Sequence, residues 1–222
     1  MRSVVKGPRA VLFDLDGTLV DTAPDLGHAA NLVRAESGLS PLSVSQYRPV
    51  ASAGARGLLK VAFGIDPDHA DFPARRETFL TYYRKNLARK SRLFPGMDRA
   101  LADLERRRVP WGVVTNKPQW LTDPLMQELN LAARAAVTIG ATEALKPKPA
   151  PDGLLRACFT LGLPAAECVY VGDDLRDVMA AHAAGMPVAA AAWGYVDYGE
   201  PIERWGADAI LQEPEELGTL WP

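Results

Sequence analysis

The feature that most constrains the fold is the alternation, from residue 109 onward, of short apolar runs with segments of helical periodicity. The runs hold few polar residues, which is typical of strands buried on both faces. The strands are expected at residues 111–116, 135–139, 168–171, 188–192 and 209–211, and the helices at residues 121–129, 152–161 and 175–184. Because parallel strands need crossover connections, this alternation predicts a Rossmann-like, doubly wound parallel α/β sheet with helices on both faces.

The long segment at residues 20–91 departs from that alternation, although the apolar run at 10–13 before it supplies a first strand. Helical patterns extend from the candidate N-cap Thr22 to near Gly38, and occupy residues 58–63 and 72–87. No convincing strand interrupts them. The sequence therefore predicts an all-α helical cap, residues 20–91, inserted into a core domain made of residues 1–19 and 92–222.

Charge and cysteine content limit the classes of protein that this chain can belong to. The 25 basic and 27 acidic side chains give a net charge of −2, so nothing indicates binding to nucleic acid or to a membrane. Arg2, Lys6 and Arg9 precede no apolar segment long enough for a signal peptide. Cys158 and Cys168 form no CxxC pair and are expected to be free thiols. We therefore expect a cytoplasmic protein, either a monomer or a homodimer.

Two carboxylates follow the first predicted strand. Asp14 and Asp16 come directly after the apolar run at 10–13, and Gly17 allows the chain to turn sharply there. Two carboxylates so close together repel one another unless a cation or a shared proton relieves them. The pair therefore indicates either a site built for chemistry or an acidic turn that closes a loop.

Polar side chains also follow two other predicted strands. Thr115 and Asn116 end one strand, and Asp173 and Asp174 end another. Lys146 lies in a Lys-Pro-Lys-Pro segment whose prolines stiffen the backbone. Ligands of parallel α/β sheets bind beyond the carboxyl ends of the strands, so these groups are expected to share one crevice. Carboxylate oxygens suit Mg²⁺, while lysine and hydroxyl donors suit a phosphate. The combination predicts Mg²⁺-assisted phosphoryl transfer.

Other phosphate-binding or metal-binding designs are absent from the sequence. It contains neither the GxxxxGK[ST] motif of a P-loop nor a GxGxxG dinucleotide motif. His28, His69 and His182 lack the spacing of metal ligands, and Gly17 comes too early for a calcium loop.

Four segments, taken in order, resemble the motifs of haloacid dehalogenase superfamily phosphatases of the phosphoglycolate phosphatase-like branch. They are Asp14-Leu15-Asp16-Gly17-Thr18, Val113-Val114-Thr115-Asn116, Lys146-Pro147 and Gly172-Asp173-Asp174-Leu175-Arg176-Asp177. The helical insert lies where that family carries its cap, so the resemblance covers nearly the whole chain.

The resemblance implies a covalent mechanism. Asp14 would be the nucleophile that forms an aspartyl-phosphate, and Asp16 the acid and base that serves the leaving group and the attacking water. Mg²⁺ would be held by Asp14, the main-chain carbonyl of Asp16, and Asp173. Thr115 would bind the phosphoryl oxygens, and Lys146 would screen the charge of Asp14.

Several neighbours of these residues have roles that the resemblance leaves open. Asp174 and Asp177 could ligate Mg²⁺, lie in its outer shell, or cap the helix that begins at residue 175. Gly17, Thr18 and Asn116 complete the expected substrate-binding residues of the core.

The helical insert is expected to choose the substrate. In the predicted loop at residues 52–57, Gly54 and Ala55 would let the backbone approach a ligand, and Arg56 could pair with a carboxylate. The structural alternative is a helix start with an exposed arginine. The seven basic side chains between residues 75 and 92 likewise read either as a solvated helix face or as a positive wall that attracts an anion.

Two groups of phosphatases remain as guides to the substrate. Phosphoglycolate phosphatases carry a similar loop, but the chain departs from their Gly-Asn-Gly pattern. The loop, residues 63–69 and residues 193–195 look more like those of proteobacterial N-acetylmuramic acid 6-phosphate phosphatases. Both substrates carry a carboxylate, so Arg56 does not separate them.

Three function classes stay open from the sequence. The first is a phosphatase acting on a small anionic phosphomonoester; the second is a sugar phosphomutase of the same fold; the third is a non-catalytic binding protein. Asp16 disfavours dehalogenation, because dehalogenases of this fold lack a carboxylate at that position. Phosphonate hydrolysis would need a Schiff-base lysine in the cap, and Lys60 is the nearest candidate, although its surroundings do not mark it out.

Overall fold

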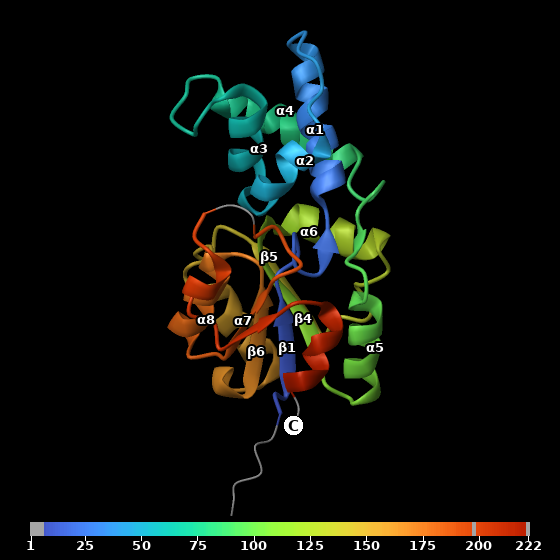
Figure 1. The fold of residues 1–222 in the computed structure, drawn as a ribbon, viewed down its shortest axis with the longest axis vertical. Coiled ribbons are helices and arrows are strands. Elements are labelled where there is room, and N and C mark those ends of the chain that lie inside the picture. The colour runs from blue at the N-terminus through green and yellow to red at the C-terminus, as the bar shows by residue number, and fades with distance from the viewer. Residues whose placement is uncertain (1–6, 197–198, 221–222) are drawn as a thin grey trace, which may run out of the picture.

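A computed structural model of the chain describes residues 7–196 and 199–220, so Arg2 and Lys6 lie outside the described residues. At its centre the described residues form a six-stranded parallel sheet in the order β5-β4-β1-β6-β7-β8 (Figure 1). The strands are β1 (Ala10–Phe13), β4 (Trp111–Pro118), β5 (Val137–Ala141), β6 (Cys168–Gly172), β7 (Val188–Ala191) and β8 (Ala209–Leu211). β1 pairs in parallel with β4 on one side and β6 on the other, so the residues after it lie at the centre of the sheet edge.

Helices cover both faces of this sheet, and alternate side chains of β1 pack against each layer. Val11 and Phe13 belong to the core shared with α5 and α6. Leu12 belongs to the core shared with α7 and α8. The helices are α5 (Met97–Arg106), α6 (Gln119–Glu128), α7 (Asp152–Leu161) and α8 (Leu175–Ala184). The predicted doubly wound α/β sheet is confirmed.

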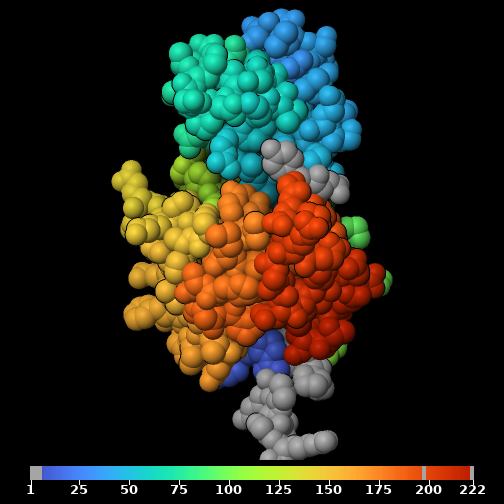
Figure 2. All heavy atoms as spheres, turned by 60° about the vertical axis from the view of Figure 1, so that its left-hand side comes forward, coloured from blue at the N-terminus to red at the C-terminus, as the bar shows by residue number. Residues whose placement is uncertain are grey.

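The segment between β1 and α5 contains helices beyond the carboxyl ends of the strands. These helices, here called the helical group, are α1 (Ala23–Glu36), α2 (Val44–Tyr47), a 3₁₀ helix (Arg48–Ala53), α3 (Gly54–Phe63) and α4 (Phe72–Lys85). They pack against one another and form an upper lobe in the space-filling view (Figure 2). That residues 20–91 form an inserted cap domain stays a prediction. The helices of the helical group all lie within this segment.

A short antiparallel pair that the sequence did not reveal joins the two chain passages into the helical group. β2 (Val20–Asp21) pairs with β3 (Arg92–Leu93). Two-residue strands carry no readable periodicity, and their pairing is set by distant segments. Thr22 occupies the N-cap position of α1 but makes no capping hydrogen bond, because its hydroxyl donates to Asp16 instead (2.5 Å).

Hydrogen bonds anchor both chain segments that connect the core with the helical group. The Tyr195 hydroxyl accepts from the N–H groups of Thr22 and Ala23 and donates to Asp21. On the return passage the buried Asp25 carboxylate accepts from the backbone N–H groups of residues 90 and 91. The start of α1 and the chain before β3 are thereby tied to one another and to the core.

Two further features are the state of the cysteines and the apolar character of the helices. Cys158 and Cys168 are both buried and free. Within residues 7–196 and 199–220, no helix has the length and apolar character needed to cross a membrane.

Candidate active site

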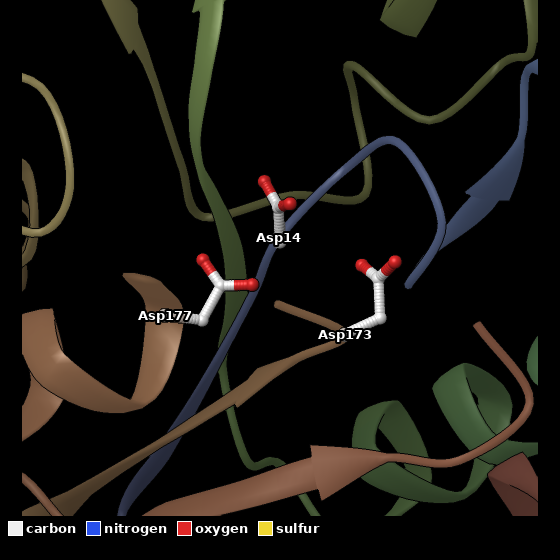
Figure 3. Close-up of side chains that lie close together, drawn as sticks. All are labelled: Asp14, Asp173 and Asp177. Atoms are coloured by element: carbon white, nitrogen blue, oxygen red, sulfur yellow. The ribbon is translucent and has the colours of Figure 1, made fainter. Parts of the chain in front are cut away.

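Three carboxylates converge at the carboxyl edge of the sheet (Figure 3). Asp14 follows β1, Asp173 follows the neighbouring β6, and Asp177 lies in the first turn of α8. One oxygen of each lies within 4.8 Å of the other two, and all three side chains are buried. The parallel pairing of β1 with β6 therefore brings together carboxylates that are far apart in the sequence.

The electrostatics of this cluster favour a bound cation. Burial, followed by the charge of Asp14, raises the pKa of Asp173 to about 8. Burial also raises the pKa of Asp177 to about 7, even though Lys148 opposes the shift. Oδ1 of Asp14 is buried, and its charge is balanced in part by Nζ of Lys148, which lies 2.8 Å away. An all-oxygen site that is short of positive charge fits a hard divalent cation such as Mg²⁺, which Asp14 and Asp173 would hold.

The lysine at this cluster is Lys148, not Lys146, and the sequence-based choice is corrected here. Nζ of Lys148 lies 2.8 Å from Asp14 Oδ1 and 2.6 Å from Asp177 Oδ1. Burial alone would lower the pKa of Lys148, but the two carboxylates outweigh it and the pKa is raised. Lys146 is exposed, and its backbone N–H donates to Asp152.

Asn116 binds the backbone of the lysine that enters the site. Its side-chain oxygen accepts from the backbone N–H of Lys148 (2.8 Å), and its amide nitrogen donates to the Lys148 carbonyl (3.0 Å). Asn116, expected as a substrate-binding residue, thus holds the backbone of the lysine segment in this structure. Two lysines two residues apart in a Lys-Pro-Lys-Pro segment carry no sequence signal that separates them.

The turn after β1 is shaped around Asp173. Thr18 is buried and its hydroxyl donates to Asp173 Oδ1 (2.6 Å), while the backbone N–H of Tyr195 donates to Oδ2 (3.0 Å). Gly17 has φ +96°, and a Cβ there would lie 2.2 Å from Asp173 Oδ2. Gly17 and Thr18, expected as substrate-binding residues, therefore serve to pack and orient Asp173 in this structure.

Asp174 and Asp177 have different surroundings. Asp174 is the N-cap of α8, where it accepts from the backbone N–H of Arg176 and forms an ion pair with the guanidinium of Arg176 (2.7 Å). Asp177 lies in the acidic cluster and also accepts from the backbone N–H of Asp174. Of the three roles left open, Asp174 thus takes that of the helix cap, whereas Asp177 lies in the carboxylate cluster and also completes the capping box of α8.

Asp16 is held apart from the acidic cluster by its own partners. Both of its oxygens accept from Nζ of Lys117, at 2.9 and 3.1 Å, and Oδ1 accepts from Thr22. Thr115 is buried nearby, and its hydroxyl accepts from the Lys117 backbone N–H (3.2 Å). The sequence motifs did not single out Lys117.

A cavity of about 330 Å³ lies between the core and the helical group. From the core, Asp14, Asp16 and Thr115 line it. From the helical group, its lining includes residues 51–56, Leu26, Phe72, Arg76, Phe79, Leu80 and Tyr83. The guanidinium groups of Arg56 and Arg76 have no hydrogen-bond or ion-pair partner among the described residues.

The predicted loop at residues 52–57 is helical. It comprises the end of the 3₁₀ helix and the first turn of α3, so Arg56 is an exposed arginine at a helix start, as the structural alternative has it. Gly54, Ala55 and Arg56 nevertheless line the cavity. Lys60, two turns along α3, is exposed and paired with Asp66, and it does not line the cavity.

The family of the chain follows from comparison with known proteins. A family model described as haloacid dehalogenase-like hydrolase matches residues 11–191. The chain belongs to this family. The expected family and fold are thus confirmed, and the chain is a hydrolase.

Relatives with known names match almost the whole chain. An N-acetylmuramic acid 6-phosphate phosphatase of Pseudomonas putida is 44% identical over 94% of this chain and 94% of its own length. A phosphoglycolate phosphatase of Xanthomonas campestris pv. campestris is 43% identical over 97% of this chain and 98% of its own. The crystal structure of a predicted phosphoglycolate phosphatase from Haemophilus somnus superimposes with a TM-score of 0.84 at 27% identity, covering 97% of this chain and 99% of that one.

The raised pKa values of Asp173 and Asp177 predict how the stability of the metal-free protein depends on pH. Each group binds its proton more tightly in the folded state than in the unfolded state, where an aspartate has a pKa of about 3.9. Folding is therefore favoured at low pH, and this contribution is lost as the pH rises toward 8. Chemical unfolding in EDTA should show the free energy of unfolding falling by roughly 2 kcal/mol per pH unit between pH 6 and 7, because both groups are largely protonated in the folded state over this range.

Mg²⁺ should oppose the fall in stability with rising pH, because it competes with protons for the carboxylates of Asp173 and Asp177. The stabilisation by Mg²⁺ should be larger at pH 8 than at pH 6, and Asp173→Asn should reduce both the pH slope and the Mg²⁺ effect. A stability that rises with pH in EDTA, or a Mg²⁺ effect unchanged in Asp173→Asn, would contradict this description of the cluster.

Lys148 and Lys146 form a matched pair of substitutions. Lys148→Met removes the cation between Asp14 and Asp177, and losing one partner of a buried ion pair typically costs about 3–5 kcal/mol. Lys146→Met alters an exposed side chain and should change stability by no more than about 0.5 kcal/mol. Urea unfolding at pH 8 without metal measures both. Equal effects of the two substitutions would refute the assignment of Lys148.

Proposed function

We propose that the protein is a Mg²⁺-dependent phosphatase that hydrolyses a small anionic phosphomonoester through an aspartyl-phosphate. The observation that carries the proposal is the buried cluster of Asp14, Asp173 and Asp177, balanced by Lys148 and opening onto a cavity. The names of the relatives, which are phosphatases, support the same reaction.

The reaction proceeds in two displacements at phosphorus. A carboxylate oxygen of Asp14 attacks, the ester P–O bond breaks, and the leaving alkoxide takes a proton from Asp16. Asp16, now a carboxylate, removes a proton from water, which attacks the phosphorus of the aspartyl-phosphate. That step releases inorganic phosphate and restores both side chains. Mg²⁺, held by Asp14, Asp173 and the Asp16 carbonyl, would neutralise the charge of the phosphoryl group.

The remaining groups stabilise the transferring phosphoryl group. Lys148 supplies a fixed positive charge beside Asp14, the role that the resemblance implied for Lys146. Thr115 lines the cavity next to Asp14, where its hydroxyl can donate to a phosphoryl oxygen. Asn116 acts through Lys148, whose backbone it holds. Preorganised donors of this kind stabilise charge without reorganising during the reaction.

Residues 20–91 serve in this proposal as the cap domain that selects the substrate over the core of 1–19 and 92–222. The unpaired guanidinium groups of Arg56 and Arg76 fit a carboxylate on the substrate. The cavity also has an apolar wall that includes Leu26, Phe72, Phe79 and Leu80. Its volume of about 330 Å³ falls within the range of roughly 300–1,000 Å³ that is typical of drug-sized ligands.

This size favours N-acetylmuramic acid 6-phosphate over 2-phosphoglycolate as the substrate. A two-carbon acid would leave the apolar wall without contact, whereas an N-acetylated sugar with a lactyl ether can cover it. The sugar phosphate also carries the carboxylate that an unpaired arginine would bind.

Steady-state kinetics on both substrates, with inorganic phosphate as the product measured, tests the proposal. We expect Mg²⁺-dependent phosphate release, with kcat/KM at least about tenfold higher on N-acetylmuramic acid 6-phosphate. Arg56→Met and Arg76→Met should each raise KM about tenfold or more, the loss typical of a hydrogen bond to a charged group. Arg75→Met is the matched control, because Arg75 packs over Phe63 and does not line the cavity.

Each other outcome has a distinct meaning. Isomerised sugar phosphate without free phosphate would replace the phosphatase with a phosphomutase. No release from any phosphomonoester would favour a binding protein. A preference for phosphoglycolate would overturn the argument from cavity size.

A further inference from the structure

Lys117 is a buried cation that the proposed reaction does not use. It lies near the end of β4 and is 8% exposed. Its Nζ donates to Oδ1 of Asp16 (2.9 Å), to Oδ2 of Asp16 (3.1 Å) and to the hydroxyl of Tyr83 (2.8 Å). The side chain also lies against the ring of Tyr83, with Nζ 4.5 Å from the ring centroid.

These contacts leave Lys117 no donor for a substrate. An ammonium group has three N–H bonds, and Lys117 has three acceptor atoms within hydrogen-bond distance. Although Lys117 lines the cavity, it is saturated by protein groups. Stability alone is also a weak reason for such a pair, because apolar residues of similar volume often replace a buried ion pair without loss. The geometry therefore favours an effect exerted through Asp16.

The backbone of Lys117 belongs firmly to the core. Its N–H donates to the Thr115 hydroxyl (3.2 Å), and its carbonyl accepts from the Thr122 hydroxyl (3.2 Å). Asp16, by contrast, lies in the turn after β1 with part of its side chain exposed to the cavity. A fixed ammonium that contacts both carboxylate oxygens restricts the rotation of that carboxylate.

Tyr83 brings the helical group into the same contact. It lies on α4, it is 1% exposed, and its ring stacks on Phe79. The bond from Lys117 to Tyr83 therefore forms only while α4 lies over the end of β4. Without Tyr83, one donor of the buried ammonium would lack an acceptor, which is costly in such a place.

We propose that Lys117 is a positioning residue that fixes the carboxylate of Asp16 for proton transfer. Because Lys117 also binds Tyr83 of α4, the orientation of Asp16 depends on whether α4 lies over the core. The proposal rests on the proposed phosphatase function. It assigns Lys117 and Tyr83 to the acid–base step and not to binding of the substrate.

The leaving group separates this role from a structural one. An alkyl phosphate needs a proton on its leaving oxygen, whereas p-nitrophenolate leaves without one. Single-turnover rates, with enzyme in excess, should be measured on N-acetylmuramic acid 6-phosphate and on p-nitrophenyl phosphate. Lys117→Met should slow the first turnover of the sugar phosphate up to about 100-fold, within the range typical of acid–base catalysis. Release of p-nitrophenol in the first turnover should change less than about threefold, followed by a slow steady state because water activation also uses Asp16.

Tyr83→Phe provides a second, milder variant that keeps the ring and Lys117. It should shift the ratio of the two rates in the same direction by a smaller factor. Tyr47→Phe is its control. Tyr47 is also buried in the helical group, but its hydroxyl donates to Asn31, and Tyr47 does not line the cavity. Tyr47→Phe should leave the ratio unchanged.

Several results would overturn the proposal. Equal slowing of both substrates would show an effect on folding or on the phosphoryl group, and a rise in KM alone would make Lys117 a substrate ligand. If Lys117→Met does not fold, an unchanged ratio in Tyr83→Phe refutes the coupling to α4. Absence of phosphate release by the unsubstituted enzyme would instead refute the proposed phosphatase function.

Discussion

The repulsion among Asp14, Asp173 and Asp177 is the constraint on which the rest of the site depends. The three carboxylates lie within 4.8 Å of one another in a buried place, where each ionised group raises the cost of ionising the next. Lys148 supplies one positive charge against three carboxylates that can ionise, so the cluster is short of positive charge and suited to a further cation. Such a site contributes little to the stability of the folded chain, and perturbed pKa values of this kind are common in catalytic centres.

Much of the surrounding structure keeps that unfavourable cluster in place. Thr18 and the backbone N–H of Tyr195 hold Asp173, and Gly17 permits the close approach of its turn to that carboxylate. Asn116 fixes the backbone of the lysine that faces Asp14. Tyr195 also binds the start of α1, so one residue contributes to both the acidic cluster and the passage into the helical group.

The sequence was sufficient for the fold and for part of the site, and the reasons are physical. Apolar runs and helical spacing are local patterns, so the strands and most helices were readable. Asp14 and Asp173 were found because the carboxyl ends of parallel strands meet at one edge. Lys148 and Lys117 were missed because contacts between distant segments bring them into the site. Asn116 binds the backbone of Lys148, and Asp16 and Tyr83 bind the ammonium group of Lys117. The pairing of β2 with β3 is equally non-local.

If Asp14 carries the phosphoryl group during turnover, chemical trapping should reveal the acyl phosphate on this residue. The enzyme is mixed with substrate and Mg²⁺, quenched in acid during the first turnover and treated with borohydride, which reduces an acyl phosphate to the alcohol. Mass spectrometry of the digest should then find homoserine in place of aspartate at position 14, and Asp14→Asn should give none. Homoserine at another aspartate, or unmodified Asp14 during active phosphate release, would rule out Asp14 as the nucleophile.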